Sequence, residues 1–454
     1  MTTVIKKANI LYGIELQIIE NAIIVVNNQG VIEKIGKSSH LTEGAYYSNI
    51  IENKDTCVIN AEGYMVIPGL VNSHTHIGDA IGKDISSNAD LDTRVNPNRS
   101  IKKTILEKTE TEQLKQSMKN TAISMLNKGI TTFVDFREGD LNGVKLLKTA
   151  TQDIPIRNVI LGRIDFNDFY GDAGDSAEVT TATETMDNNT FDDDGCVGNK
   201  LKNKEDVLKR GKDMLNLCNG FGISGANECN DEILAIYRNV AMESNKQNIC
   251  NKKEKPIIAI HAAESDEAVK ESLKKTGKTE IERTIHTLNP DLYVHLTNPK
   301  TSDIDLLYSA HKGVVICPRA NGVLGVGFPP INEMLKRGLT IAIGTDNIML
   351  NSPDMFKEMD FLIRSQRAYE KNISFLDAKM VLQMATVNGG KILNRNIGRI
   401  ENGYQADLVF IDEYDIDMYP MHDPYMSIVS RCSERAIKAT MINGRFAHDK
   451  SNIN

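Results

Sequence analysis

Two histidines stand two residues apart in the stretch PGLVNSHTH, which covers residues 68–76. In an extended strand, side chains at positions i and i+2 lie on the same face, so His74 and His76 can point toward one common atom. Neutral imidazole is a good ligand for zinc, iron and nickel. Nine histidines in 454 residues also produce such pairs by chance, but here an apolar strand precedes the pair. The pair therefore predicts one side of a metal site.

Other polar residues end apolar stretches in a similar way. His261 ends IIAIH and is followed by Glu264, His295 ends LYVH, and Asp346 follows TIAIGT. Taken singly, each has an ordinary structural interpretation: a hydrogen-bonded core histidine, a helix cap or an Asx turn. Taken together, the histidine pair, His261 and Asp346 predict a catalytic metal site. Three imidazoles and one carboxylate leave a coordination position for water.

The segments that carry these residues alternate between strand-like and helix-like patterns. We predict eight strands, at residues 64–71, 130–136, 156–161, 220–224, 256–261, 292–295, 313–317 and 340–344. Strands that alternate with helices form parallel sheets with crossover helices, and eight such units suggest a closed (β/α)8 TIM-type barrel. Active sites of these barrels lie at the carboxyl ends of the strands, which is where the polar residues fall.

Short strand-like segments also occupy both ends of the chain. They cover residues 18–26, 31–35 and 56–60 before the barrel, and residues 406–411 and 439–446 after it. The pattern predicts one small β-sandwich built from both termini. We therefore divide the chain into a composite β-sandwich domain of residues 1–65 and 400–454 and a barrel domain of residues 66–399.

One segment interrupts the alternation of strands and helices. Residues from about 165 to 206 are polar and acidic, with the run TTATETMDNNTFDDDG, and show little apolar periodicity. This composition is typical of a solvated insertion. Because such loops follow barrel strands on the active face, a lid over the barrel mouth is the other interpretation.

The composition is that of a globular protein, with 41% hydrophobic residues, 25% charged residues and a net charge of −8. The negative charge gives no reason to expect nucleic acid or an acidic membrane surface as a partner. No stretch approaches the ~18 apolar residues of a membrane helix, and we recognise no signal peptide. Seven scattered cysteines without a CxxC pair argue against a disulfide framework and a structural zinc ribbon. We expect a cytoplasmic protein that acts on a small molecule.

The motifs resemble those of the amidohydrolase superfamily, in particular the branch of cytosine deaminase, guanine deaminase, S-adenosylhomocysteine deaminase and the triazine chlorohydrolases. The matching stretches are PGLVNSHTH (68–76), HAAE (261–264), VHLT (294–297), CPRAN (317–321), GTDN (344–347), GRIENGYQADLVFID (398–412) and INGR (442–445). The resemblance spans nearly the whole chain except the acidic insertion. It implies a distorted barrel with a β-sandwich from both termini, and a homodimer or higher homo-oligomer.

The resemblance also implies a role for each motif residue. The metal ligands would be His74, His76, His261 and Asp346. Asp346 would also take a proton from the metal-activated water, whose pKa a metal can lower from 15.7 to about 7. Glu264 would pass that proton to the ring nitrogen or leaving group, and His295 would orient and polarise the attacked carbon's surroundings.

The sequence departs from the family pattern at positions that determine the number of metal ions and the substrate. Relatives with two metals use a carboxylated lysine at the end of the fourth strand, where this chain has SGANE (224–228). We therefore predict one divalent metal per chain, zinc before iron. The candidates for substrate binding are Asp79, Asn227, Glu228, Arg319 and Asn321.

Three interpretations of function follow. The leading hypothesis is hydrolytic deamination of a purine, pyrimidine, pterin-like or nucleoside-type heterocycle. The alternative is the opening of a cyclic amide or imidazolone ring, because the same activated water serves both reactions. A third is a catalytically inactive homologue used for binding, which the complete ligand set disfavours. The HxE and PCxxC pair of the deaminases that edit nucleic acids is missing from this chain.

Overall fold

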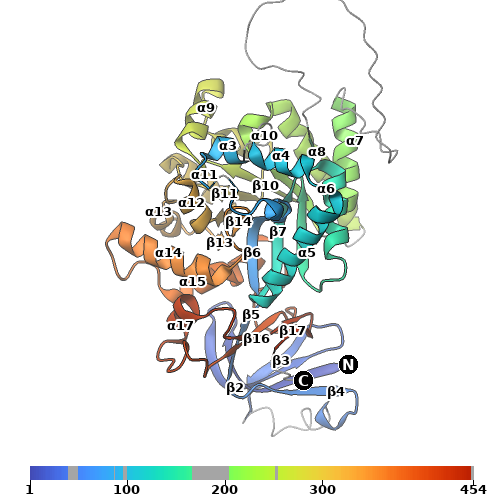
Figure 1. The fold of residues 1–454 in the computed structure, drawn as a ribbon, viewed down its shortest axis with the longest axis vertical. Coiled ribbons are helices and arrows are strands. Elements are labelled where there is room, and N and C mark those ends of the chain that lie inside the picture. Colours follow the sequence, from blue (N-terminus) through green and yellow to red (C-terminus); the bar gives the residue numbers. More distant parts are fainter. Residues whose placement is uncertain (39–49, 86, 96–99, 166–203, 251–253, 451–454) are drawn as a thin grey trace, which may run out of the picture.

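The computed structural model describes residues 1–38, 50–85, 87–95, 100–165, 204–250 and 254–450. In these residues a barrel of parallel strands stands on a smaller sheet (Figure 1). The arrangement confirms the predicted α/β class, a TIM-type barrel with a small β domain made from both termini. No helix in this part of the chain is both long and apolar enough to span a membrane. The acidic insertion predicted at about 165–206 falls almost entirely outside the described residues.

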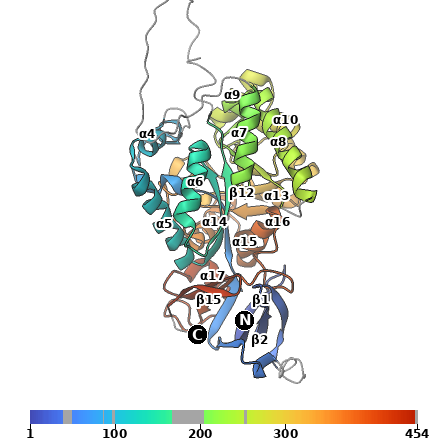
Figure 2. The same ribbon diagram turned by 90° about the vertical axis from the view of Figure 1, so that its right-hand side faces the viewer.

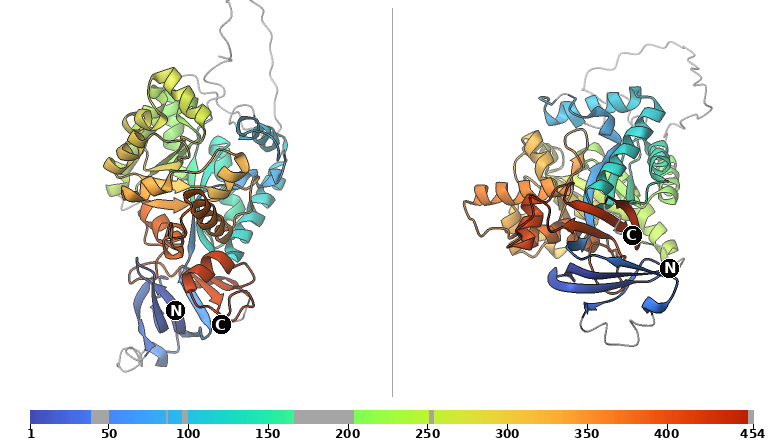
Figure 3. Two further views of the ribbon diagram at one scale, coloured as in Figure 1. Left: turned by 90° about the vertical axis from the view of Figure 1, so that its left-hand side faces the viewer. Right: turned by 60° about the horizontal axis from the view of Figure 1, so that its bottom comes forward.

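The smaller sheet takes strands from both ends of the chain. Across the sheet they are β17 (Arg445–Asp449), β16 (Ile437–Ile442), β15 (Leu408–Asp412), β5 (Tyr64–Pro68), β1 (Thr2–Tyr12), β2 (Gln17–Val26) and β3 (Ile32–Lys37), with β4 (Thr56–Asn60) paired to β1. One apolar cluster joins Ile5 and Ile24 of the N-terminal strands to Phe410 of the C-terminal strands. Figure 3 shows the blue and dark red strands side by side below the barrel.

The barrel strands are parallel and follow one another in chain order. They are β6 (Leu70–His76), β7 (Ile130–Arg137), β8 (Arg157–Gly162), β9 (Gly220–Ile223), β10 (Ile257–Ala262), β11 (Leu292–His295), β12 (Gly313–Ile316), β13 (Ile341–Ile343) and β14 (Asp346–Asn347). The short strand β14 pairs with β6, and Asp346 lies opposite Thr75. Because β14 follows β13 after two residues, this pairing closes the ring and brings Asp346 next to the histidine pair.

Helices surround the barrel, as Figure 2 shows. In chain order the helical elements are η1 (Ile77–Gly82), α3 (Leu91–Val95), α4 (Ile101–Lys108), α5 (Thr111–Asn127), α6 (Asp140–Thr151), α7 (Lys204–Leu217), η2 (Ala226–Glu228), α8 (Asp231–Cys250), α9 (Asp266–Thr276), α10 (Glu280–Thr287), α11 (Thr301–Ser309), α12 (Pro318–Leu324), α13 (Ile331–Lys336), α14 (Met355–Glu370), α15 (Ala378–Ala385), α16 (Val387–Ile392) and α17 (Pro424–Arg431). Helices α3 and α4, between β6 and β7, lie at the end of the barrel away from the smaller sheet (Figure 1).

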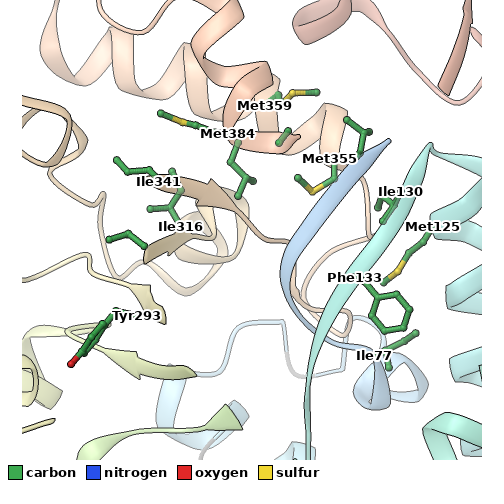
Figure 4. Packing of buried hydrophobic residues seen from close by; sticks show 14 of the residues in the cluster. Ile77, Met125, Ile130, Phe133, Tyr293, Ile316, Ile341, Met355, Met359 and Met384 are labelled. Atoms are coloured by element: carbon green, nitrogen blue, oxygen red, sulfur yellow. The ribbon is translucent and has the colours of Figure 1, made fainter. Parts of the chain in front are cut away.

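Alternation along the strands separates an interior layer from an outer layer. In β10, Ala259 belongs to the cluster inside the barrel, whereas Ile258 and Ile260 belong to the cluster between strands and helices. Figure 4 shows this outer cluster, in which Ile316 and Ile341 lie near methionines of the C-terminal helices. Strands buried on both faces have continuous apolar runs, which is why the sequence shows them without an alternating pattern.

The predicted strand at 64–71 is in fact two strands that belong to different sheets. β5 pairs with β15 in the smaller sheet, and β6 pairs with β7 in the barrel. The change falls at Gly69, whose N–H donates to Asp407 O, while the N–H of Leu70 donates to Gly129 O. A Cβ on Gly69 would lie 2.2 Å from the hydroxyl of Thr131, so glycine allows the close passage. The domain division proposed at residues 65 and 400 stays a prediction.

Candidate metal centre and active site

The four predicted metal ligands converge inside the carboxyl end of the barrel. His261 continues the interior row of β10 that begins with Ala259, because side chains two residues apart face the same side. His74 and His76 come from β6, and Asp346 from β14 takes a left-handed backbone conformation with φ 59°. All four residues are buried, and one ligand atom of each lies within 4.8 Å of the others.

The distances within this cluster suit a shared cation. His74 Nε2 lies 3.1 Å from His261 Nε2 and 3.2 Å from Asp346 Oδ1. His76 Nε2 lies 3.6 Å from the same Asp346 oxygen. Lone pairs of two neutral imidazoles repel at such a separation, and a cation between them converts the repulsion into coordination. The donor set therefore fits one divalent metal, and three nitrogens with one carboxylate oxygen suit zinc.

Hydrogen bonds to the other ring nitrogens orient two of the histidines. His261 Nδ1 lies 3.0 Å from the carbonyl oxygen of Ser224, and His76 Nδ1 lies 2.8 Å from Glu138 Oε1. Since both partners only accept, each Nδ1 carries the proton and donates it. Each Nε2 therefore presents a lone pair toward the cluster, as a metal requires.

The charge states implied by burial also suit a cation. Burial lowers the pKa of His74 to about 3 and holds the pKa of His261 well below its usual value, so both are neutral. Burial alone would raise the pKa of Asp346, but the contact with His74 and the nearby imidazoles hold it below its usual range. Neutral imidazoles and an ionised carboxylate are the forms that bind a metal.

A second group of potential ligands, His295, Cys317 and Asp346, shares one member with the first. Burial raises the pKa of the Cys317 thiol well above its usual value, which makes its deprotonation more costly. Only the thiolate is a metal ligand. Because the two groups share Asp346 and the first offers three imidazoles among the described residues, one metal fits best at the group that contains three histidines.

Glu264 and His295 lie together beside the metal ligands. Glu264 Oε1 is 3.6 Å from His295 Nε2, and burial raises the pKa of the Glu264 carboxyl above its usual value. His295 Nδ1 lies 3.1 Å from Asn321 Oδ1, so this nitrogen donates and leaves Nε2 facing Glu264. The two side chains are thus placed where a substrate atom could contact both.

The turn before Glu264 is held by two side chains from later in the chain, Glu280 and Thr297. Ala263 has φ 50°, and its N–H donates to Glu280 Oε2 at 2.8 Å. The Thr297 hydroxyl contacts the carbonyl oxygens of Ala263 at 3.0 Å and Glu264 at 2.5 Å. A left-handed alanine persists only where its surroundings fix it, which these bonds do.

A cavity of about 1000 Å³ opens over the cluster. Its base contains His76, His261 and Asp346, and α3 and α4 contribute Leu91, Val95 and Lys102 to its wall. Of the predicted substrate contacts, Asn227 and Glu228 also line it. The volume lies at the upper end of the range of small-molecule sites.

The other three predicted substrate-binding residues do not line this cavity. Asp79 is buried below the cavity, where it accepts hydrogen bonds from Asn347 Nδ2 at 2.6 Å and Met349 N at 3.0 Å. Arg319 lines a separate hollow against α14 and contacts Glu358. Asn321 is fully buried and contacts His295 rather than the cavity.

The structure adds a buried network that the sequence analysis did not predict. Lys102 Nζ lies 2.5 Å from Glu138 Oε1 and 3.3 Å from Asp79 Oδ2, and the second oxygen of Glu138 accepts from Arg137 at 2.7 Å. Glu138 holds His76, so this network supports a predicted metal ligand from behind. Glu138 directly follows strand β7. A polar residue at the end of a predicted strand is the same pattern by which His261 and His295 were predicted. Lys102 lies on a short helix without any such signal.

Replacing Glu138 with glutamine should weaken metal binding about 10- to 100-fold, the usual cost of losing a carboxylate behind a ligating histidine. A neutral amide holds the His76 N–H less strongly and can present its own N–H instead. Competition with a chromophoric chelator measures the metal dissociation constant. Glu112→Gln, whose side chain is 82% exposed, is the matched control. Equal constants for Glu138→Gln and wild type would refute the supporting role.

Comparison with known proteins places the chain in a family. The model of the amidohydrolase family matches residues 65–447, and the chain belongs to this family. A protein of Methanothermobacter thermautotrophicus that carries the provisional name aminohydrolase is 34% identical over 388 residues, covering 86% of this chain and 88% of that protein.

Two further proteins are similar to this chain at lower sequence identity. The 5-methylthioadenosine/S-adenosylhomocysteine deaminase of Thermococcus sibiricus is 27% identical over 454 aligned residues, which cover 98% of this chain and 93% of that protein. The crystal structure of an adenosine deaminase from Xanthomonas campestris with bound zinc superposes with a TM-score of 0.77 at 19% identity, covering 99% of this chain and 93% of that one. This likeness confirms the predicted fold.

Proposed function

We propose that this protein is a metal-dependent hydrolytic deaminase of an aminated heterocycle. The observation that carries the proposal is the placement of Glu264 and His295 beside three histidines and an aspartate at the base of one cavity. Relatives named as deaminases of adenosine-type molecules support deamination over other hydrolyses. The family membership supports hydrolysis itself.

The proposed metal ligands are His74, His76, His261 and Asp346. When bound, the metal supplies an activated water that attacks an sp² carbon at neutral pH. The cluster leaves no lysine or further carboxylate for a second ion among its described members, so we propose one zinc per chain.

The chain's own residues then move the protons and orient the ring. Asp346, ionised in its setting, accepts a proton as the water attacks. Glu264 carries a proton to the ring nitrogen or to the leaving amine, so that the C–N bond breaks and ammonia departs. His295 hydrogen-bonds the attacked centre and stabilises the charge that develops there. The products are the oxo-heterocycle and ammonia.

An ammonia-release screen tests the proposal. We expect zinc-loaded protein to release ammonia from at least one group among aminated purines, pyrimidines, pterins and nucleosides. The mass of the product separates the reactions, because deamination exchanges NH for O, whereas ring opening adds a whole water. Ring-opened product from cyclic amides, with no ammonia from any aminated ring, would overturn the proposal.

We propose a cytoplasmic location and a homodimer or higher homo-oligomer as well. The five described cysteines, Cys57, Cys218, Cys229, Cys317 and Cys432, are free thiols, which fits a reducing compartment. Light scattering on the purified protein measures the oligomeric state. A monomer at all concentrations would refute the proposed homo-oligomer.

A further inference from the structure

One wall of the cavity is acidic, and its carboxyl groups have few hydrogen-bond or ion-pair partners among the described residues. Glu228 on η2, Glu264 after β10 and Glu280 at the start of α10 all line it. Glu264 and Glu280 both raise the pKa of Glu228, and Glu264 raises the pKa of Glu280, so the three carboxyls lie within electrostatic range. We call this group the acidic wall.

Glu280 is the most deeply buried member of the acidic wall, with an exposed fraction of 4%. One of its oxygens accepts from the N–H of Ala263, and no cation among the described residues forms an ion pair with it. Burial and the charges of Glu264 and Glu271 raise its pKa to about 7. A buried carboxyl without a cation is costly unless something else satisfies it.

Glu228 has even fewer protein partners. No described side chain or backbone N–H lies within hydrogen-bonding or ion-pairing distance of its carboxylate, and burial raises its pKa to about 7. The nearest compensating charge is Arg163, whose guanidinium donates to the Ser224 hydroxyl. The neighbouring Asn227 presents a buried side-chain oxygen that also accepts no hydrogen bond among the described residues.

The cations on the opposite wall do not neutralise these groups. Lys102 contacts Glu138 and Asp79, and Arg137 contacts Glu138 and lies 3.7 Å from Asp135. Their charges are thus already matched by carboxylates outside the acidic wall. The cavity therefore offers, on the side of η2 and α10, carboxyl groups that no cation among the described residues pairs with.

We propose that the acidic wall, through Glu228 and Glu280, binds a second nitrogen group of the substrate, one that carries several N–H donors or a positive charge. The substrate class is then an aminated heterocycle with an amino, amidino or guanidino-like group besides the amine that leaves. A donor-rich group forms hydrogen bonds with these carboxyls, whereas a ring without such a group displaces water from them and offers no hydrogen bond in return. This inference rests on the proposed function, because it assigns specificity to the same cavity.

A pair of small probes tests the inference by binding, without requiring turnover. Zinc-loaded protein is titrated calorimetrically with 2,4-diaminopyrimidine and with 4-aminopyrimidine, which differ only in the second amino group. We expect the diamino probe to bind about 10- to 100-fold more tightly, the usual value of one or two hydrogen bonds to a charged acceptor. The same pair is then titrated into Glu228→Gln, Glu280→Gln and a control, Glu232→Gln, whose side chain is 63% exposed.

The expected result is a preference that Glu228→Gln lowers at least about 10-fold and that the control retains. Glu280→Gln should also lower this preference. Circular dichroism establishes that each variant is folded, and metal analysis establishes that it contains zinc. Equal affinity of wild type for the two probes, including no measurable binding of either, would overturn the inference. The inference would also be overturned if Glu228→Gln and Glu280→Gln both kept the wild-type preference for the diamino probe. The ammonia screen decides the proposed function separately, since it uses no acidic-wall variant and is read from the product.

Discussion

Replacing Glu264 with glutamine is expected to lower kcat about 10²- to 10⁴-fold, the range for loss of a general acid–base group. Glutamine has nearly the same shape but cannot accept and release a proton. The zinc content should stay at that of wild type, because Glu264 is not among the clustered ligands. Steady-state ammonia release and metal analysis on the same preparations measure both quantities.

Two further results make this prediction specific to Glu264. Glu112→Gln, whose side chain is 82% exposed and does not line the cavity, should keep wild-type activity. A substitution that acts only by loosening the turn should raise KM as well as lower kcat, whereas loss of proton transfer lowers kcat at nearly unchanged KM. Activity of Glu264→Gln within threefold of wild type would remove Glu264 from the proposed mechanism.

Replacing Lys102 with methionine is expected to destabilise the fold by about 3–5 kcal/mol, the usual cost of removing one partner from a buried ion pair. Burial disfavours its charge, but Glu138 and Asp79 raise the pKa of Lys102, so it is charged at neutral pH. Among the described residues, the substitution leaves Asp79 without a cation and leaves Arg137 as the remaining cation beside Glu138. Urea unfolding of metal-free protein measures the change.

The same substitution should also weaken zinc binding. Lys102 contacts Glu138, which holds His76, and Asp79, which accepts from Asn347 beside the ligand Asp346. The control is Lys103→Met, a more exposed neighbour paired with Glu107, which should cost less than about 1 kcal/mol. Unchanged stability and zinc affinity in Lys102→Met would show that the network does not support the metal centre.

Much of the fold was predictable because barrel strands are buried on both faces. Seven of the eight predicted strands overlap one barrel strand each, and the polar residues at their ends identified the cluster. The exception, 64–71, is the run YMVIPGLV, in which the pair Pro68-Gly69 stands where the chain changes sheet but does not say that the second half joins another sheet. That change depends on a contact between Gly69 and Thr131, which are distant in sequence and meet only in the folded chain.

The surroundings of the cluster were less predictable for a related reason. Arg319 and Asn321 both follow β12, but α12 begins at Pro318 and turns the two side chains in different directions. Asn321 therefore reaches His295, whereas Arg319 reaches Glu358 on the outer side. Lys102 reaches the cluster only because α4 folds back over the barrel mouth, and no local spacing encodes that path.

Zinc titration of metal-stripped protein, with ammonia release recorded at each addition, tests the central claim most directly. The account predicts that ammonia release from a substrate found in the screen rises linearly and reaches its plateau at one zinc per chain. It also predicts that His261→Ala, which lacks one clustered ligand, neither retains zinc nor releases ammonia at the same concentrations. A plateau at two zinc ions per chain, or ammonia release that does not depend on metal, would contradict a deaminase built on one metal.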